Sequence, residues 1–179
     1  RESGVVANSR EMEAEFGGRL RGIEGRFGDM FDLLSAEGVS AVDGVALDLG
    51  VSSMQLDQAE RGFSFMSDGP LDMRMEQKGQ SAADVVNNFG EEDLANIIYE
   101  FGEERRSRWV AHAIVEARAE QKITRTGQLA DIVCRVVKKS YDGIHPATRT
   151  LLGSRIYVND ERGAVDRGLS GAARLLAPA

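Results

Sequence analysis

The sequence predicts an α/β fold that is interrupted by an all-helical insert. Short apolar runs alternate with helical segments over residues 1–79, a pattern typical of a parallel sheet with crossover helices. From Gln80 onward the apolar residues take helical spacing, and strand-forming residues become rare. We therefore expect three segments: a first α/β part at residues 1–79, a helical insert at residues 80–145 and a second α/β part at residues 146–179.

Three apolar runs in the first segment are expected strands: residues 4–7, 20–24 and 42–49. Helices are expected between them, at residues 9–16 and 29–37. The first helix ends at Gly17-Gly18, and the second begins at the N-cap Asp29 and ends at Gly38. Strand, helix and strand at this spacing suggest a right-handed parallel crossover, with Phe27 and Asp48 at the carboxyl ends of neighbouring strands.

Four helices are expected in the insert. Ser81 and Asp84 have the spacing of a capping box before the first of them. Gly102 has the position of a C-cap glycine, and Thr126 is the expected N-cap of the fourth helix. Cys134 is expected to be a small core residue. The apolar stripes are interpreted as core rather than binding surface: Leu94, Ile97, Ile98, Phe101, Trp109, Ile114, Val115, Leu129, Ile132, Val133 and Val136.

The last segment is expected to be helical from Ala147 to Leu176, with a break near Asn159-Asp160. Its buried candidates are Leu151, Leu152, Ile156, Val158, Val165, Leu169, Leu175 and Leu176. A helix that returns to a sheet should be followed by another strand.

Composition and charge narrow the class of protein. The chain has 179 residues, 42% of them hydrophobic, and a formal net charge of −7, which argues against non-specific coating of nucleic acid. Positive charge is nevertheless clustered locally, at Arg105, Arg106 and Arg108 and again at Arg135, Lys138 and Lys139. The absence of a signal peptide and of an apolar run of about 20 residues makes a cytoplasmic location the expectation. One Cys and two His argue against a metal site.

The stretch from Asp43 to Arg74 is the strongest candidate for a ligand site. A buried run ends in Asp48 and breaks at Gly50 into a segment too irregular for helix or strand. Ligand sites of open α/β sheets lie outside the carboxyl ends of the strands. Asp48 is therefore either a ligand-contacting carboxylate or the cap of the next turn.

Four blocks of sequence carry a family resemblance. They are DLGVSSMQLDQAERGFSFMSDGPLDMRM at residues 48–75, EERRSRWVAHAIVEAR at 103–118, HPATRT at 145–150 and RIYVNDE at 155–161. In this order they resemble the RsmH (MraW) family of bacterial methyltransferases that use S-adenosyl-L-methionine (AdoMet). A long block followed by shorter blocks in a fixed order is far more specific than a short glycine motif.

The resemblance implies a class I (Rossmann-like) methyltransferase domain with a helical substrate-recognition insert. It implies transfer of a methyl group from AdoMet to the N4 amine of a cytidine in the decoding region of small-subunit ribosomal RNA. Asp48 and Gln55 match AdoMet-contacting positions of the family, and Phe27 matches the residue that lines its adenine pocket. The implied partner is ribosomal RNA or the assembled small subunit, bound by a cytoplasmic monomer or homodimer.

The chain departs from the family pattern in three places. The family's N-terminal GGHT-type loop with its acidic ribose ligand and the C-terminal SFHSLED-like strand have no counterpart. The segment after HPATRT reads LLGS at residues 151–154 where the family reads FQAL. We therefore expect a methyltransferase domain that is incomplete at both ends.

The chemistry suits Asp48. The N4 amine of cytosine is a poor nucleophile, because its lone pair is delocalised into the ring, and a hydrogen-bond acceptor favours a pyramidal nitrogen and accommodates the released proton. Asp48 is the expected acceptor and catalytic residue, and it also offsets the charge of the sulfonium. The carbonyls of Leu49 and Gly50 are further acceptors, while Ser52 and Ser53 are expected to orient the base or the cofactor's carboxylate.

Other residues are candidate RNA contacts. Phe63 and Phe65 either stack an extruded base or pin the loop onto the core. Candidates for phosphate contact are Arg135, Lys138 and Lys139. His145 is either a phosphate contact or a loop hinge, and Arg149 either contacts phosphate or pairs with an internal carboxylate. Arg61, Arg74 and Arg155 either contact phosphate or pair with internal carboxylates, and internal pairing is favoured for Arg61 and Arg74.

Two other functions stay open. A non-catalytic RNA- or protein-binding module derived from a truncated methyltransferase is favoured by the lack of the glycine-rich loop. A methyltransferase for a small molecule is disfavoured, because such a substrate needs no docking surface as large as the insert.

Overall fold

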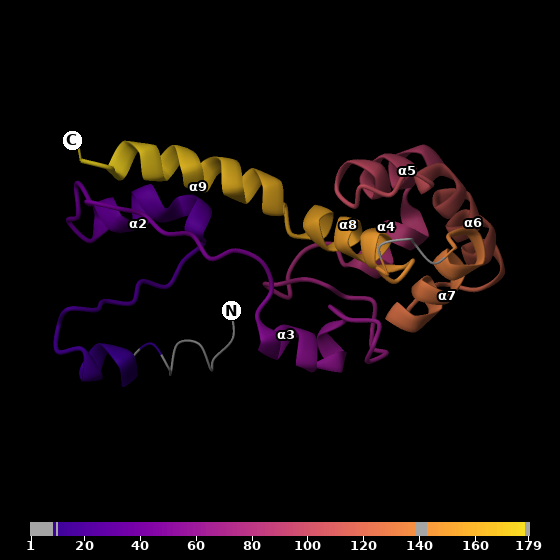
Figure 1. Cartoon of the computed structure of the whole chain (residues 1–179), viewed down its shortest axis with the longest axis horizontal. Helices are drawn as coiled ribbons and strands as arrows, with labels where there is room; N and C mark the ends of the chain where they lie inside the picture. The colour runs from indigo at the N-terminus through magenta and orange to yellow at the C-terminus, as the bar shows by residue number, and fades with distance from the viewer. Residues whose placement is uncertain (1–8, 10, 139–142, 178–179) are drawn as a thin grey trace. The chain divides into compact units, whose positions relative to one another are not determined.

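The computed structural model describes residue 9, residues 11–138 and residues 143–177, and these form two compact units (Figure 1). The first unit comprises the described parts of Arg1–Leu49 and Arg162–Ala179, and the second comprises those of Gly50–Glu161. Every regular element in this described part of the chain is a helix, and two isolated β-bridges join extended segments. Helices α4 to α8 gather in the second unit (Figure 1).

The first unit contains η1 (Phe27–Asp29), α2 (Met30–Ala36) and most of α9 (Glu161–Leu175). Residues 11–15 are also helical, and Gly17 and Gly18 follow them with φ of +55° and +81°. Gly38 ends α2 at φ +79°, a left-handed conformation that glycine adopts without steric cost. Both helices predicted for this segment are therefore confirmed.

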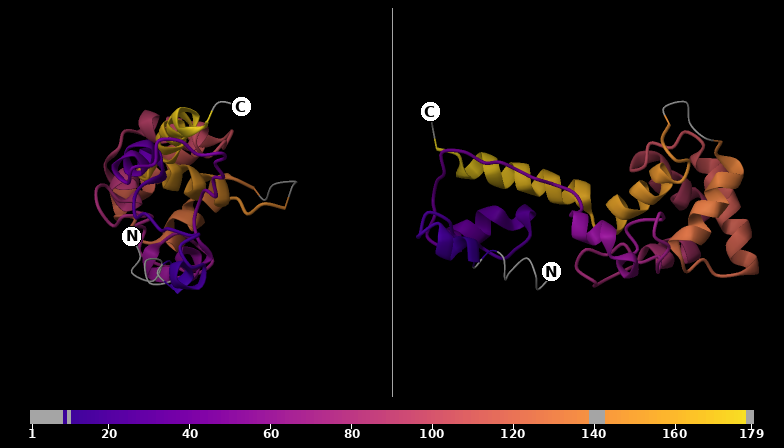
Figure 2. Two further views of the ribbon diagram at one scale, coloured as in Figure 1. Left: turned by 90° about the vertical axis from the view of Figure 1, so that its left-hand side faces the viewer. Right: turned by 60° about the horizontal axis from the view of Figure 1, so that its bottom comes forward.

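Helix α9 packs closely against η1 and α2 (Figure 2). A side chain at Gly168 would place its Cβ 2.8 Å from Cδ2 of Phe27, so glycine permits this approach. Nearly two turns further along α9, the guanidinium carbon of Arg174 lies 3.4 Å from the centre of the Phe31 ring. These contacts position Phe27, one of the predicted cofactor residues.

The strands predicted in this unit are wrong wherever the structure describes them. Residues 20–24 are irregular, and in the segment 42–49 only Val42 pairs, through a parallel bridge to Leu176. The N–H of Val42 donates to the carbonyl of Leu175 at 2.8 Å, and the N–H of Ala177 donates to the carbonyl of Val42 at 3.0 Å. A strand needs a ladder of such bonds, which apolar spacing alone does not supply. The expected strand at residues 4–7 lies outside the described residues.

The second unit is built around a helical core. Its elements are α3 (Ser53–Asp57), η2 (Ala59–Arg61), α4 (Ala82–Asn88), α5 (Glu91–Glu100), α6 (Ser107–Glu120), α7 (Thr126–Val136) and α8 (Thr148–Val158). Helix α6 packs against α5 and α7, and α8 packs against α4 and α5. Val85, Ile98, Ile114, Leu129 and Val133 are at most 2% exposed in this core. The four helices predicted for the insert are confirmed.

Several details of these helices are also confirmed. Ser81 and Asp84 form the predicted capping box at the start of α4. The last predicted helix breaks at Asn159 and Asp160, where Asp160 has a φ of +48°. Helix α8 ends before this break and α9 begins after it.

Other details are corrected. Trp109 is 69% exposed, Leu169 54% and Leu176 46%, so these three are not core residues, and Cys134 is exposed as well. Arg125 rather than Thr126 is the N-cap of α7. A helical stripe wider than the neighbouring contact leaves its flanking residues in solvent, which explains Leu169. Trp109 lies on the side of α6 away from its buried residues.

Gly102 serves a purpose different from the predicted one. The left-handed residue after α5 is Glu103, with a φ of +55°. A Cβ on Gly102 would lie 2.2 Å from the carbonyl oxygen of Arg149, so glycine is required here for the approach of α8 to α5. Glycine at position 102 is therefore required by helix packing and not by helix termination.

The second unit extends beyond the predicted insert on both sides. Leu71 and Met73 are 1% exposed and belong to its core, as does Leu151 at 4%. The N–H of Leu71 donates to the carbonyl of Thr124 at 2.8 Å, and the side-chain Nδ2 of Asn159 donates to the carbonyl of Met73 at 2.7 Å. The first bond joins the preceding segment to the insert, and the second joins the preceding and following segments to each other. The assignment of residues 80–145 to substrate recognition stays a prediction.

Candidate functional site

Ser52 and Gln55 form a reciprocal capping box at the start of α3. The N–H of Gln55 donates to Oγ of Ser52 at 3.2 Å, and the N–H of Ser52 donates to Oε1 of Gln55 at 3.1 Å. The segment after Gly50 was predicted to be too irregular for helix or strand. The structure shows that it contains a short helix, α3. Its signal was present in the sequence as Ser-x-x-Gln, a capping-box pattern. The box holds the carboxamide of Gln55 in one orientation.

The other two predicted cofactor residues belong to the first unit. Asp48 is exposed, and Phe27 is half-buried with its ring against Gly168. Ser52, Ser53 and Gln55 belong to the second unit, where the two serines are exposed and Gln55 is half-buried. The contacts of these side chains with a cofactor stay predictions.

The segment from Arg61 to Met75 is anchored to the core of the second unit. Phe63 is 8% exposed, and the guanidinium carbon of Arg61 lies 5.6 Å from the centre of its ring. The same guanidinium donates to the carbonyls of Arg74 and Met75 at 3.2 and 3.1 Å. This burial favours the packing role for Phe63, and base stacking by this residue stays a prediction.

Carboxylates of this segment are paired within the protein. Arg74 donates to Asp72 through Nε at 2.9 Å and Nη2 at 2.6 Å, and Arg125 Nε donates to Asp68 at 2.5 Å. The hydrogen bond from Arg74 lowers the pKa of Asp72, and that from Arg125 lowers the pKa of Asp68. The predicted internal pairing is therefore confirmed for Arg74, whereas Arg61 bonds to backbone carbonyls. Arg155 pairs with Glu161, Nε to Oε1 at 2.8 Å.

Phe65 and His145 are brought together by the fold of the second unit. Their ring centroids are 4.6 Å apart, with an interplanar angle of 35°. Nδ1 of His145 accepts from the N–H of Ala147 at 3.2 Å, which fixes the imidazole at the start of α8. Nε2 lies 4.0 Å from Sγ of Cys134, whose pKa is raised by partial desolvation of the thiol and by the nearby Asp131. Two candidate RNA-contact residues, far apart in sequence, thus form one aromatic pair.

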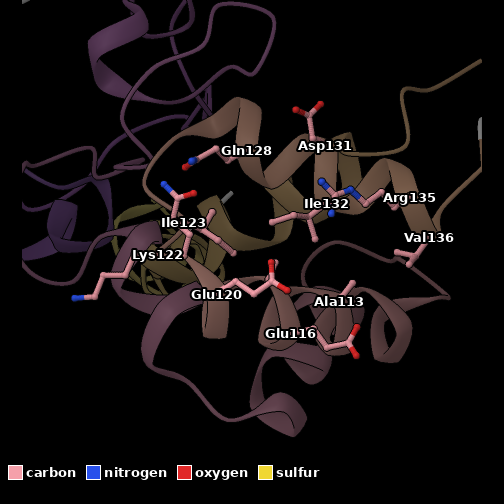
Figure 3. Close-up of a pocket in the computed structure, with 12 residues that line it drawn as sticks. Ala113, Glu116, Glu120, Lys122, Ile123, Gln128, Asp131, Ile132, Arg135 and Val136 are labelled. Atoms are coloured by element: carbon pink, nitrogen blue, oxygen red, sulfur yellow. The ribbon is translucent and has the colours of Figure 1, made fainter.

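A groove of about 590 Å³ lies between α6 and α7 (Figure 3). Arg135, Val136 and Ala113 line one end, and Lys122, Ile123 and Gln128 line the other. Glu116, Glu120 and Asp131 also line it, so the groove itself is not basic. Arg135 and Lys138 are exposed, whereas Lys139 lies outside the described residues. Arg149 is half-buried in the first turn of α8.

The described residues hold neither a metal-binding cluster nor a membrane-spanning helix. They contain no group of three or more His, Cys, Asp and Glu side chains arranged to hold a metal ion. Within the same residues, no helix has the length and apolar character required to cross a membrane.

Comparison with known proteins identifies the family. A family model described as the MraW methylase family matches residues 1–179. This chain belongs to that family. The match spans both compact units, and it confirms the resemblance carried by the four sequence blocks.

Relatives of the MraW methylase family are similar over nearly the whole chain. The Ribosomal RNA small subunit methyltransferase H of Rhodospirillum rubrum is 64% identical over 165 residues, covering 92% of this chain and 51% of the relative. The protein of that name from Paramagnetospirillum magneticum is 61% identical over 178 residues, covering 99% and 56%. The one from Methylobacterium sp. strain 4-46 is 60% identical over 179 residues, covering 99% and 53%. The chain thus spans about half the length of these relatives.

Family membership bears on the predicted fold class in one respect. A methyltransferase of this family implies a Rossmann-like domain, whereas the described residues of this chain contain helices and two isolated bridges. The arrangement of the helical unit as an insert within a Rossmann-like domain stays a prediction.

Proposed function

We propose that the protein transfers a methyl group from AdoMet to the N4 amine of a cytidine in the decoding region of small-subunit ribosomal RNA. The observation that carries this proposal is the family match over residues 1–179, together with relatives named for methylation of small-subunit ribosomal RNA. The base and the position follow from the motif resemblance of residues 48–75. The substrate is the RNA itself or the assembled subunit.

The residues assigned to AdoMet have groups that fit it. Asp48 is an exposed carboxylate, which accepts hydrogen bonds and offsets a sulfonium charge. Gln55 presents a carboxamide that the capping box already orients, and Phe27 presents an aromatic ring. Between Asp48 and Gln55, Gly50 has a φ of +116° and open space where a Cβ would stand, which suits close approach of a ligand to the backbone.

Asp48 is assigned the catalytic role. Bound AdoMet supplies an activated methyl group, so the protein's task is to position the amine and to stabilise charge. The carboxylate of Asp48 accepts a hydrogen bond from the N4 amine and receives the proton that the nitrogen loses. Ser52 keeps its hydroxyl hydrogen for a ligand, because its Oγ acts as acceptor in the capping box. Ser53, exposed beside it, is the second candidate for orienting the base.

RNA contacts are assigned to the second unit. The Phe65–His145 pair offers a surface for an unpaired base, since aromatic rings stack on bases of any sequence. Arg149, Arg135, Lys138 and Lys139 are assigned to phosphates, and Phe63 supports the loop from within the core. Residues 80–145 form the docking insert in this proposal.

The test is methyl transfer from radiolabelled AdoMet to small-subunit ribosomal RNA by the full-length gene product. Asp48→Asn removes the anionic acceptor and should lower transfer at least about 100-fold while the thermal unfolding curve stays unchanged. Transfer by this variant at a near-normal rate contradicts the catalytic role of Asp48.

A matched pair of variants separates the two roles of Gln55. Gln55→Glu retains the capping-box acceptor but replaces the amide donor by a carboxylate oxygen, whereas Ser52→Ala removes the cap and retains the amide. Isothermal calorimetry with AdoMet should therefore show the larger loss of affinity for Gln55→Glu. If only Ser52→Ala weakens binding, Gln55 supports α3 and does not contact the cofactor.

The alternative function is a non-catalytic RNA- or protein-binding module. It predicts RNA binding without any calorimetric response to AdoMet in the full-length gene product. That result would remove the enzyme assignment altogether.

A further inference from the structure

Trp109 lies on the outside of the helical unit with 69% of its surface exposed. The opposite side of α6 is fixed by the buried residues Ser107, Val110, Ala111 and Ile114, none more than 5% exposed. Tryptophan is highly buried on average and tends to lie at interfaces when a folded domain exposes it. The exposed indole therefore indicates a contact surface.

Arginines flank the indole. Arg105 lies in the turn before α6, Arg108 is the neighbour of Trp109, and both are exposed. Within the described part of the chain, neither guanidinium takes part in a hydrogen bond or an ion pair. These two cations are thus available to an anionic partner.

The packing of α6 against α7 brings the two basic clusters of the sequence toward each other: the arginines at 105, 106 and 108 and the cations at the end of α7. Nη1 of Arg106 donates to the carbonyl of Val136 at 3.1 Å, so the start of α6 lies against the end of α7. Figure 3 shows the same antiparallel arrangement, because Ala113 of α6 and Val136 of α7 line one end of the groove. We use the name Trp109 corner for the exposed residues that flank this contact along the chain: Arg105, Arg106, Arg108, Trp109, Arg135 and Lys138.

We propose that the Trp109 corner binds an unpaired stretch of RNA, with one base stacked on the indole and its phosphates on the surrounding cations. The inference rests on the proposed function and names the surface through which the substrate is held. Five of the six residues of the corner are cationic in a chain whose net charge is −7, and the acidic residues Glu116, Glu120 and Asp131 line the adjoining groove. The five cations are complementary to phosphate.

The exposed indole indicates whether the bound RNA is single-stranded or double-stranded. Proteins that hold single strands combine cations along the backbone with aromatic rings that stack on bases. In a duplex the faces of the bases are covered by their neighbours, and only the phosphates are accessible to this surface. Binding at the corner should therefore prefer single-stranded over double-stranded RNA.

The first experiment measures the affinity of the full-length gene product for a fluorescein-labelled single-stranded RNA oligonucleotide. Trp109→Ala should weaken binding about tenfold, the loss of one stacked base, and Trp109→Phe should restore most of it. The same oligonucleotide annealed to its complement should bind both variants equally. Unchanged affinity of Trp109→Ala for the single strand overturns the proposal.

Tryptophan emission provides a direct readout of stacking. The chain contains one Trp, so the emission difference between the wild-type protein and Trp109→Phe isolates Trp109. Addition of the single strand should quench this difference signal. A signal that RNA leaves unchanged at saturating concentration excludes stacking on Trp109.

The second experiment tests the cations through salt dependence. The double variant Arg105→Ala/Arg108→Ala should reduce the slope of log affinity against log salt by about 1.4, because each lost phosphate contact of a single strand contributes roughly 0.7. Lys122→Ala is the matched control, since Lys122 is exposed at the opposite end of the groove and should leave the slope unchanged. An equal slope for the double variant and the wild type overturns the phosphate contacts.

Failure of this inference is distinct from failure of the proposed function. If the wild type methylates RNA and Trp109→Ala binds and methylates normally, the corner is wrong and the function stands. If the wild type transfers no methyl group to RNA but Trp109→Ala loses RNA affinity, the function is wrong and the corner stands. A dimer that Trp109→Ala dissociates, with RNA affinity unchanged, identifies the corner as a protein interface and overturns the proposal.

Discussion

The two units differ in how much buried core supports them. In the second unit, α4 to α8 enclose a continuous set of apolar side chains, among them Val86, Ile114 and Leu129 at 0–1% exposure. In the described part of the first unit, the buried apolar residues are Ala172 and Leu175 of α9. The free energy of local unfolding follows the density of such contacts, so the second unit is the more stable of the two. The candidate RNA-contact residues and Gln55 lie on the better supported unit, whereas Asp48 and Phe27 lie on the weakly supported one.

The largest expected effect comes from substitutions that remove an apolar side chain in each unit. Ile114→Ala removes a fully buried side chain of α6 and should lower the free energy of unfolding of the second unit by about 2–5 kcal/mol. Leu33→Ala in α2 removes a half-buried side chain and should cost only about 1 kcal/mol. Hydrogen exchange read by mass spectrometry resolves both effects by segment. Equal losses of protection in the two units contradict the comparison.

Replacing a glycine by alanine in each unit should give the next largest effect on stability. In Gly102→Ala the new Cβ meets the carbonyl of Arg149, so α5 and α8 must separate at a cost of about 1–3 kcal/mol. Gly44→Ala is the matched control in the first unit, because no atom lies within 4 Å of its Cβ position. The midpoints of urea unfolding should therefore fall for the first variant and stay unchanged for the second. A stable Gly102→Ala protein would mean that the helices are not packed this closely.

Acid titration gives the smallest expected effect. Arg74 holds the pKa of Asp72 below its ordinary value of 3.8, so the folded state binds that proton more weakly than the unfolded state. The carboxylate consequently stabilises the second unit above pH 3.8, and this contribution is lost as the pH falls through the lowered pKa. Its size is at most about 1 kcal/mol, because the pair is partly exposed.

Two variants locate this acid effect. Asp72→Asn and Arg74→Ala should both reduce the dependence of stability on pH below 3.8, and urea unfolding at stepped pH measures it. Asp72→Asn should reduce the dependence more than Arg74→Ala, because the backbone N–H of residue 74 still donates to Oδ1 of Asp72 in the second variant. If Arg74→Ala retains the wild-type slope, Asp72 owes its lowered pKa to another neighbour.

Some features of the candidate site could be predicted from the sequence and others could not. The motif at residues 48–75 was sufficient to identify the family, because a long ordered block rarely occurs by chance. The internal pairing of Arg74 was also predictable, since acids crowd its own segment. The tilted ring contact between Phe65 and His145 was not, because the two residues are 80 positions apart in the sequence and only the packing of the second unit brings their rings together.

Helices were determined by the sequence itself. Their hydrogen bonds join residues four apart, so capping residues such as Ser81 and the break at Asn159-Asp160 were enough to place them. The predicted strand at residues 42–49 did not form, because its backbone groups need partners from distant segments and only Val42 has one in the described residues. Only the tertiary structure decided which helix faces were buried. The neighbours of α6 cover Ile114 and leave Trp109 in solvent, and its antiparallel packing against α7 joins two basic clusters that are separate in the sequence.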